Sequence, residues 1–262
     1  MNLDGQNISG ITGEARLKQF FTEHPKCALA FSGGVDSAYL LYAAKKAGAE
    51  VRAYYVKAAF QPEFEFQDAI RLAEEIGADM KVLHVDVLSD DTVRKNPKDR
   101  CYYCKKQIFG NILAAAKADG FSVILDGTNA SDDASDRPGM KALLEMQVLS
   151  PLRLSGLTKA DIRALSKKAG LFTWNKPAYA CLATRIPTGE EITEEKLLAT
   201  ERSEEFLMKR GFTDFRVREF QGTAKLQLRE EQIPKLLENR EEILAELRKY
   251  YTAVTLDLEV RP

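Results

Sequence analysis

The sequence predicts an α/β fold, a doubly wound and mostly parallel sheet, followed by a smaller α+β domain at the C-terminus. Strand-like and helix-like patterns alternate over the first two-thirds of the chain, which is typical of a parallel sheet with helices on both faces. Near residue 190 this pattern changes, and charged helices then alternate with short strand runs. We therefore expect two domains, at residues 1–188 and 189–262.

Apolar spacing predicts the elements of the first domain. Short apolar runs bounded by turn residues indicate strands, and apolar residues at helical spacing indicate helices. Thr158 and Asp161 have the spacing of a capping box at the start of one of these helices. The expected strands are 27–31, 51–57, 81–87 and 122–126, and the expected helices are 36–47, 65–77, 102–118, 138–147 and 159–169.

The second domain is expected to contain a hairpin. Two strand runs are joined by Gln221-Gly222, a short turn that suits a tight hairpin. The charged helices are interpreted as surfaces that face solvent or another subunit, not as ligand sites. The expected helices are 193–210 and 230–248, and the expected strands are 214–220, 223–229 and 252–260.

Composition narrows the class of protein. The chain has 262 residues with 38 basic and 39 acidic side chains, and this balance argues against a large nucleic-acid footprint. No apolar run reaches the ~18 residues of a membrane span, and the N-terminus lacks the pattern of a secretory signal. We expect a cytoplasmic protein with no membrane partner. Its four cysteines are then expected to be buried or chemically active, not disulfide-bonded.

The segment Ser32-Gly33-Gly34-Val35-Asp36-Ser37 follows a strand run and opens a helix. The glycines permit a positive φ and a close approach of the backbone to a ligand. Free N–H groups and the positive end of the helix dipole favour a phosphate at this point. Ser32 and Ser37 can add hydroxyl donors, and Asp36 can hold a Mg²⁺ ion. The alternative is an ordinary strand-to-helix turn with a polar cap.

Three of the four cysteines stand out. Cys27 lies in a strand run and is interpreted as a core thiol, whereas Cys101 and Cys104 form a Cys-x-x-Cys pair and Cys181 lies in a proline-flanked loop. The residues alone leave four interpretations open: a dithiol redox pair, structural zinc, an iron–sulfur cluster with three thiolates, or three unrelated thiols. Basic neighbours are expected to lower the pKa of these thiols. They are Arg100, Lys105, Lys106, Lys176 and Arg185.

Several segments together resemble a known family. The Ser-Gly-Gly-x-Asp-Ser segment resembles the pyrophosphate loop of the ATP pyrophosphatase (PP-loop) superfamily, which cleaves ATP to AMP and pyrophosphate. The combination resembles the LarE-type ATP-dependent sulfur transferases, which build the nickel-pincer cofactor of lactate racemase. The resembling segments are 31–37, Asp126-Gly127-Thr128-Asn129-Ala130-Ser131-Asp132, Arg137-Pro138-Gly139-Met140-Lys141-Ala142, Ser150-Pro151-Leu152 and 176–187.

The resemblance implies an adenine nucleotide α-hydrolase-like fold and a defined reaction. ATP, with Mg²⁺, would adenylylate a carboxylate of pyridinium-3,5-dicarboxylate mononucleotide, and a sulfur would then give the thiocarboxylate. In one branch of the family the loop cysteine, here Cys181, gives up its own sulfur and becomes dehydroalanine. In another, a [4Fe-4S] cluster carries sulfide from an external source. Cys101, Cys104 and Cys181 match the second branch, with Asp36 and Cys181 as catalytic residues.

Other site residues follow less directly. Gly127, Thr128 and Asn129 are expected beside ATP, with a strand-terminating turn as the alternative interpretation. Arg185, Arg216 and Arg218 are expected to bind the substrate; the last two share one face of a strand and suit a phosphate, although a solvated pair is the alternative. Gln227 departs from the family, which often has a carboxylate there.

Partners and alternatives complete the prediction. By resemblance the chain is expected to form a homo-oligomer, since relatives assemble as hexamers. Three other functions are weighed: a tRNA-thiolating PP-loop enzyme, an ammonia-dependent amidating synthetase, and a nucleotide-sensing module without turnover. The favoured chemistry requires the Cys181 sulfur to meet the activated acid at the nucleotide.

Overall fold

The computed structural model describes residues 12–132 and 138–261 of the chain. Contacts divide the chain into two compact units. The first comprises Met1–Lys57, Glu63–Val85 and Lys105–Lys176, and the second comprises Ala58–Pro62, Asp86–Cys104 and Pro177–Pro262. The second unit thus takes in segments that precede the expected boundary at residue 188.

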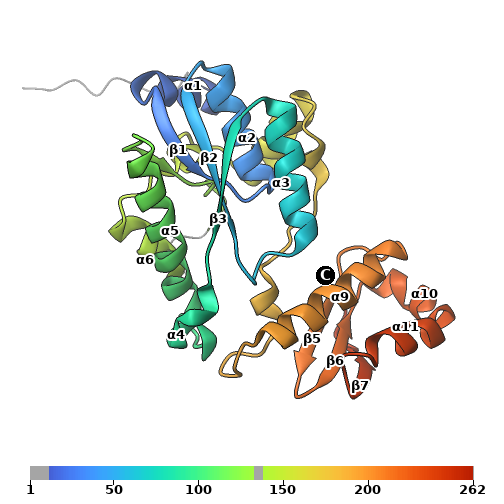
Figure 1. Cartoon of the computed structure of the whole chain (residues 1–262). Coiled ribbons are helices and arrows are strands. Elements are labelled where there is room, and N and C mark those ends of the chain that lie inside the picture. The colour runs from blue at the N-terminus through green and yellow to red at the C-terminus, as the bar shows by residue number, and fades with distance from the viewer. Residues whose placement is uncertain (1–11, 133–137, 262) are drawn as a thin grey trace, which may run out of the picture. The chain divides into compact units, whose positions relative to one another are not determined.

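As predicted, the first unit is built on a parallel sheet; it has four strands, in the order β3-β2-β1-β4 (Figure 1). At its centre, Leu29 of β1 pairs with Ala53 of β2 on one side and Leu125 of β4 on the other. All three of these residues are fully buried, because helices cover both faces. The strands are β1 (Lys26–Ala30), β2 (Glu50–Lys57), β3 (Asp79–His84) and β4 (Ile124–Leu125).

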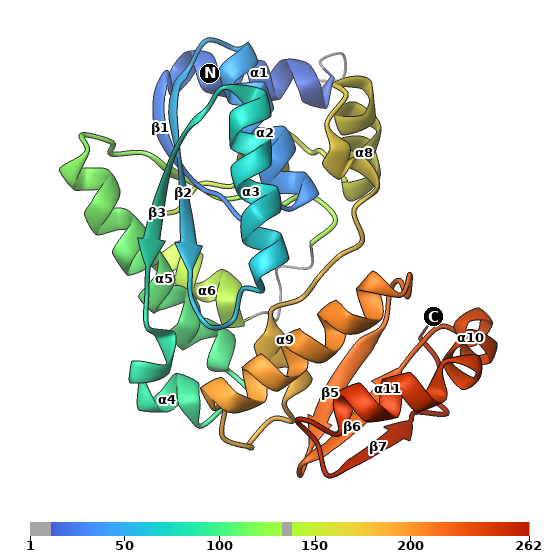
Figure 2. The ribbon, with the colours of Figure 1, turned by 45° about the vertical axis from the view of Figure 1, so that its right-hand side comes forward.

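Helices α2 and α3 lie on one face of this sheet and α5 lies on the other (Figures 1 and 2). This arrangement follows from right-handed crossovers, because α2 and α3 connect strands in one direction across the sheet and α5 returns in the other. The capping box predicted at Thr158 and Asp161 is present at the start of α8. The helices are α2 (Val35–Lys46), α3 (Glu63–Ile76), α5 (Arg100–Ala118), α6 (Pro138–Glu145), α7 (Pro151–Leu154), α8 (Lys159–Lys168) and the 3₁₀ turn η2 (Phe172–Asn175).

Two helices of this unit were not predicted, the short α7 and the longer α1. Helix α1 (Gly13–Glu23) begins at Thr12, whose hydroxyl accepts from the N–H of Ala15. Leu17 and Phe21 are buried against the core, which α2 dominates. Among the described residues, none of the helices combines the length and apolar character that a membrane crossing requires.

The second unit contains a mixed sheet in the order β5-β6-β7. The predicted hairpin is present: Gln221 and Gly222 take φ of 48° and 77°, and β5 and β6 pair antiparallel. Strand β7 pairs parallel with β6. The elements are η1 (Val87–Ser89), α4 (Asp91–Arg94), η3 (Leu182–Arg185), α9 (Glu194–Lys209), β5 (Arg216–Phe220), β6 (Thr223–Gln227), η4 (Glu230–Gln232), α10 (Ile233–Glu238), α11 (Arg240–Leu247) and β7 (Ala253–Leu256).

The single helix expected over 230–248 was wrong, because the segment forms two short helices after a 3₁₀ turn. Asn239 separates them with ψ of 12°, outside the helical range, and its side chain donates to the carbonyl of Lys235. Such a local side-chain bond competes with helix continuation. The two helices carry the chain from β6 to the parallel strand β7.

Candidate active site

In the first unit, the Ser32–Ser37 segment forms the turn between β1 and α2. The hydroxyls of Ser32 and Ser37 lie 3.1 Å apart, and the Ser37 hydroxyl donates to the carbonyl of Gly34 at 3.2 Å. Gly34 is the N-cap of α2 and has no side chain that could occupy the first N–H groups of the helix. The turn therefore offers backbone and hydroxyl donors at the positive end of a helix.

Close packing requires two glycines, Gly33 in this turn and Gly127 in the loop after β4. Gly33 has φ of +71°, and a β-carbon there would lie 2.9 Å from the β-carbon of Ala69 in α3. A β-carbon on Gly127 would lie 3.0 Å from the backbone nitrogen of Ser37. The structure thus brings Gly127, at the end of β4, directly against the start of α2.

The loop after β4 is held by its own polar side chains. Asp126 accepts hydrogen bonds from the hydroxyls of Thr128 and Ser150. The amide oxygen of Asn129 accepts from the N–H of Ser131 at 2.8 Å. Thr128 and Asn129 are both buried. The structure therefore places the predicted nucleotide-binding segment 127–129 in a fixed loop beside α2.

Asp36 lies in the first turn of α2 with its two oxygens in different situations. Oδ2 accepts from Nζ of Lys159 at 2.5 Å, whereas Oδ1 is buried without a hydrogen-bond partner in the described part of the chain. Burial raises the pKa of Asp36, and Lys159 opposes this effect. A buried carboxylate oxygen left unpaired is costly, and Mg²⁺ prefers such oxygens as ligands. Asp36 therefore fits the predicted Mg²⁺ ligand.

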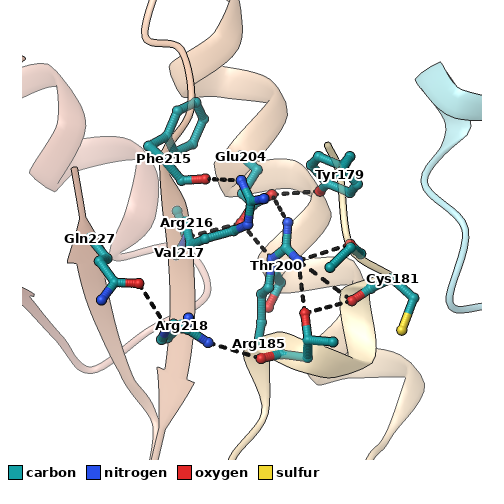
Figure 3. Close-up of polar contacts among 12 residues, drawn as sticks. Tyr179, Cys181, Arg185, Thr200, Glu204, Phe215, Arg216, Val217, Arg218 and Gln227 are labelled. Atoms are coloured by element: carbon teal, nitrogen blue, oxygen red, sulfur yellow. Dashed lines mark hydrogen bonds and ion pairs between the residues drawn. The ribbon is translucent and has the colours of Figure 1, made fainter. Parts of the chain in front are cut away.

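In the second unit, the loop that carries Cys181 is anchored by Arg185. Arg185 is 1% exposed, and its guanidinium donates to both carboxylate oxygens of Glu204, each at 2.9 Å. It also donates to the carbonyl of Ala180 at 2.9 Å. Figure 3 shows this network, with the sulfur of Cys181 directed away from it. Since the donors of Arg185 are paired with protein groups, the structure favours a positioning role for it over the predicted substrate contact.

Arg216 and Arg218 on β5 present a different situation. Arg216 donates to the carbonyls of Phe215 and Ala178, and Arg218 donates to Gln227 and to the carbonyl of Thr184. Within residues 12–132 and 138–261 neither guanidinium forms an ion pair with a carboxylate. Burial lowers the pKa of both, and neighbouring arginines lower it further. A cluster of cations short of acidic partners favours an anionic ligand.

The three predicted thiol ligands all lie in the second unit. Cys101 and Cys104 occupy the first turn of α5, where Cys101 is exposed and Cys104 is partly buried. Cys181 is partly buried and precedes η3. No group of three His, Cys, Asp or Glu side chains among the described residues is arranged to hold a metal ion. Three cysteine thiols suit an iron–sulfur cluster as ligand types, but the sulfur atoms of Cys101, Cys104 and Cys181 would have to move closer to one another for a cluster to bind.

The expected activation of Cys181 by basic neighbours is corrected by the structure. Burial raises the pKa of this thiol, and the opposing effects of Arg100 and Arg185 are smaller. Cys101 raises the pKa as well, since two thiolates repel each other. Burial also raises the pKa of Cys27, to about 12, which agrees with its interpretation as a core thiol.

Sequence reasoning missed Glu204 and Tyr179. Glu204 lies on α9, a helix interpreted as a solvated or subunit-facing surface, yet it is 1% exposed. It also accepts from the Tyr179 hydroxyl and from the N–H of Val217. The signal was present: Leu197, Thr200, Glu204 and Leu207 share one helix face by their spacing, and a carboxylate on an otherwise buried stripe indicates a buried cation partner. Arg137 lies outside the described residues.

A parallel sheet with a glycine-rich turn between β1 and α2, joined to a small α+β unit rich in arginine, defines a nucleotide-binding α/β enzyme of the PP-loop class. The family model of the queuosine biosynthesis protein QueC matches residues 26–95, which include this turn. The chain is 33% identical to the pyridinium-3,5-bisthiocarboxylic acid mononucleotide synthase of Lactiplantibacillus plantarum, over 94% of this chain and 91% of the relative.

Two further similarities place the chain among its relatives. It is 35% identical to an uncharacterized protein of Synechocystis, over 93% of this chain and 92% of the relative. It is 27% identical to the tRNA-specific 2-thiouridylase MnmA of Pseudothermotoga lettingae, over 63% of this chain and 58% of the relative. The chain belongs to the family of the pyridinium-3,5-bisthiocarboxylic acid mononucleotide synthase, the LarE-type ATP-dependent sulfur transferases of the PP-loop superfamily.

Proposed function

We propose that this protein converts the carboxylates of pyridinium-3,5-dicarboxylate mononucleotide to thiocarboxylates, at the expense of ATP, in the cytoplasm. The observation that carries the proposal is the 33% identity to the bisthiocarboxylic acid mononucleotide synthase over 94% of the chain. Two features of the described residues support it. Oδ1 of Asp36, in the first turn of α2, has no hydrogen-bond partner among these residues and suits a metal ion bound to a nucleotide. Arg216 and Arg218 of β5 form no ion pair with a carboxylate of the described chain and suit an anionic substrate.

The first step would be adenylylation. A substrate carboxylate oxygen attacks the α-phosphorus of ATP, the bond from that phosphorus to the bridging oxygen breaks, and pyrophosphate leaves with the electron pair. Ser32, Ser37 and the first N–H groups of α2 would hold the phosphates, and Gly127, Thr128 and Asn129 would border the nucleotide. Asp36 would hold Mg²⁺, which supplies charge neutralisation to the departing pyrophosphate.

The second step would transfer sulfur. A sulfur nucleophile attacks the carbonyl carbon of the acyl-adenylate, AMP leaves, and a thiocarboxylate results. A [4Fe-4S] cluster held by Cys101, Cys104 and Cys181 would supply sulfide from an external donor for this step. Arg216 and Arg218 would bind the substrate phosphate, while Arg185 would fix the loop that carries Cys181.

The sacrificial route differs in its products. The Cys181 thiolate would attack the same carbon, and β-elimination would then leave the thiocarboxylate on the substrate and dehydroalanine at position 181. Burial raises the pKa of Cys181, and both routes require its thiolate, which a base would have to form for this attack and iron would stabilise in the cluster. The Cys-x-x-Cys pair of Cys101 and Cys104, which the sacrificial route does not use, makes the cluster-dependent route our proposal.

The deciding experiment is anaerobic incubation with ATP, Mg²⁺, sulfide and the pyridinium substrate, followed by mass spectrometry of small molecules and protein. We expect AMP, pyrophosphate and several thiocarboxylates per chain, with the protein mass unchanged. A Cys101→Ala/Cys104→Ala variant should lose multiple turnover, whereas Cys27→Ala, which removes a core thiol, should retain it. Full turnover by the double variant contradicts the cluster, and a loss of ~34 Da at Cys181 indicates the sacrificial route.

The same assay separates the alternatives. A tRNA-thiolating enzyme would need tRNA for pyrophosphate release, and an amidating synthetase would need ammonia in place of sulfide. A nucleotide sensor would bind ATP without releasing pyrophosphate. The similarity to MnmA extends over 63% of this chain, against 94% for the bisthiocarboxylic acid mononucleotide synthase, and therefore favours the small-molecule substrate. A homo-oligomer, with the hexamer of the relatives as the expected form, is part of the proposal.

A further inference from the structure

Lys159 contacts Asp36 of the Ser32–Ser37 turn, and it has no role in the reaction proposed above. It is the first residue of α8, and its Nζ lies 2.5 Å from Oδ2 of Asp36, a residue 123 positions earlier in the chain. The Lys159 side chain is 36% exposed, whereas the Asp36 side chain is 20% exposed. The pair therefore lies at the rim of the loop, with its cation on the more solvent-accessible side.

The backbone around Lys159 is held rigidly to the neighbouring loop. The N–H of Lys159 donates to the hydroxyl of Ser131 at 3.0 Å, and the N–H of Ala130 donates to the carbonyl of Leu157 at 2.8 Å. The capping box of Thr158 and Asp161 fixes the first turn of α8. These bonds fix the base of the lysine side chain, while its flexible methylene stem leaves the ammonium free to change partner.

The electrostatics of Asp36 explain why a cation is needed there. The carboxylate lies in the first turn of α2, where a bound phosphate would meet its negative charge as well as the favourable N–H groups. Asp132 adds to the negative charge that Asp36 experiences, and Arg163 opposes it. Among the described residues, Lys159 is the group that bonds Asp36 directly. A Mg²⁺ ion bound to this carboxylate would remove the reason for the ion pair and release the ammonium.

We propose that Lys159 exchanges partners when ATP binds: it holds Asp36 in the free protein and moves to a phosphate oxygen when Asp36 takes the metal ion. Lys159 is then a competitor of the metal ion in the free protein and a ligand contact in the complex. The proposal rests on the proposed function only in requiring ATP at the 32–37 turn. It adds a residue of α8 to the nucleotide site.

Partner exchange predicts effects of opposite sign on two ligands. In a Lys159→Met variant the carboxylate loses its competitor, so the affinity for Mn²⁺ alone, measured by electron paramagnetic resonance, should rise several-fold. The affinity for ATP, measured calorimetrically at saturating Mg²⁺, should fall by about 10-fold because the charged hydrogen bond from the released ammonium to a phosphate oxygen is lost. Lys159→Arg should restore ATP binding, and Lys168→Met, at an exposed position on the same helix, should change neither affinity.

A merely structural role gives a different result. If Lys159→Met keeps the wild-type circular dichroism spectrum but leaves both affinities unchanged, or lowers both, the exchange is wrong. If that variant does not fold, Lys159→Gln and Lys159→Arg decide between the outcomes by the same two titrations. Asp36→Asn should abolish the gain in Mn²⁺ affinity when combined with Lys159→Met. Neither titration includes the pyridinium substrate or sulfide, so a failure of sulfur transfer leaves this inference standing.

Discussion

At the scale of single residues, the space around Gly33 limits which residue the Ser32–Ser37 turn accepts there. Gly33 has φ of +71°, and a β-carbon added to it would lie 2.9 Å from the β-carbon of Ala69. Gly33→Ala is expected to lower the free energy of unfolding by about 2 kcal/mol or more, because a left-handed alanine costs roughly 1–2 kcal/mol before any steric clash. Urea denaturation measures this loss of stability. The affinity for ATP should also fall, and calorimetry measures it.

A matched glycine isolates the steric part. Gly48 has φ of +81°, and a β-carbon added there would meet no heavy atom within 4 Å. Gly48→Ala should therefore show the backbone cost alone, with normal ATP binding. Ala69→Gly should recover part of the loss when added to Gly33→Ala. Equal costs at residues 33 and 48 would contradict the role assigned to Ala69.

The Arg185–Glu204 pair illustrates a different constraint on single residues. Its side chains are 0% and 1% exposed, so Glu204→Gln would leave a buried guanidinium without a counter-charge. We expect a loss of about 3–5 kcal/mol in the free energy of unfolding, measured by urea denaturation. Glu75→Gln, which breaks the exposed Arg71–Glu75 pair on α3, is the control and should cost less than about 1 kcal/mol. Similar costs for the two variants would show that the buried pair does not hold the loop of Cys181.

At the scale of elements, the sequence predicted a structure where neighbouring residues determine it, and failed where contacts with distant elements determine it. The 32–37 turn and the Gln221-Gly222 hairpin were predicted because their residues fix the backbone by themselves. The role of α9 was not, because Glu204 meets Arg185 and Val217, groups from other elements. Helix α1 was not predicted for a similar reason. Leu17 and Phe21 form only a short apolar pattern, and they are buried because they pack in the same core as α2.

The edge of the main sheet carries a pH-dependent contribution to stability. Asp119, just after α5, accepts from Nζ of Lys81 on β3 and from the hydroxyl of Tyr54 on β2, and these bonds lower its pKa to about 2. A lowered carboxylate pKa adds stability above the unfolded-state value, and this stability is lost as pH falls from about 4 to 2. Asp119→Asn should therefore reduce stability at pH 7 and flatten the acid limb of a denaturation profile.

The contrast with an exposed carboxylate controls this experiment. Glu74 of α3 is exposed, so Glu74→Gln should leave the acid limb of the profile unchanged. An Asp119→Asn variant with the wild-type slope between about pH 4 and 2 would show that the bonds to Lys81 and Tyr54 do not persist in solution.

At the scale of the whole molecule, the two compact units divide the proposed chemistry. The Ser32–Ser37 turn belongs to the first unit, whereas the three thiols and the arginines of β5 belong to the second. The division falls within α5, directly after Cys104, and directly after Lys176, five residues before Cys181. Lys176 is itself held in the first unit by Asp68 at 2.7 Å. The chain segments that carry the thiols are thus continuous in sequence with segments of the first unit.

Sulfur transfer requires that a nucleotide bound by one unit affects a thiol of the other. We expect saturating ATP, Mg²⁺ and the pyridinium substrate to slow the alkylation of Cys181 by iodoacetamide several-fold, measured by mass spectrometry of its peptide at early times, before turnover. Gly33→Ala, which we expect to bind ATP weakly, should show no such protection under the same conditions. Cys27, with a pKa of about 12, should stay unmodified and report any unfolding. If Cys181 reacts at the same rate with and without ligands, the proposed transfer of sulfur through Cys181 is wrong.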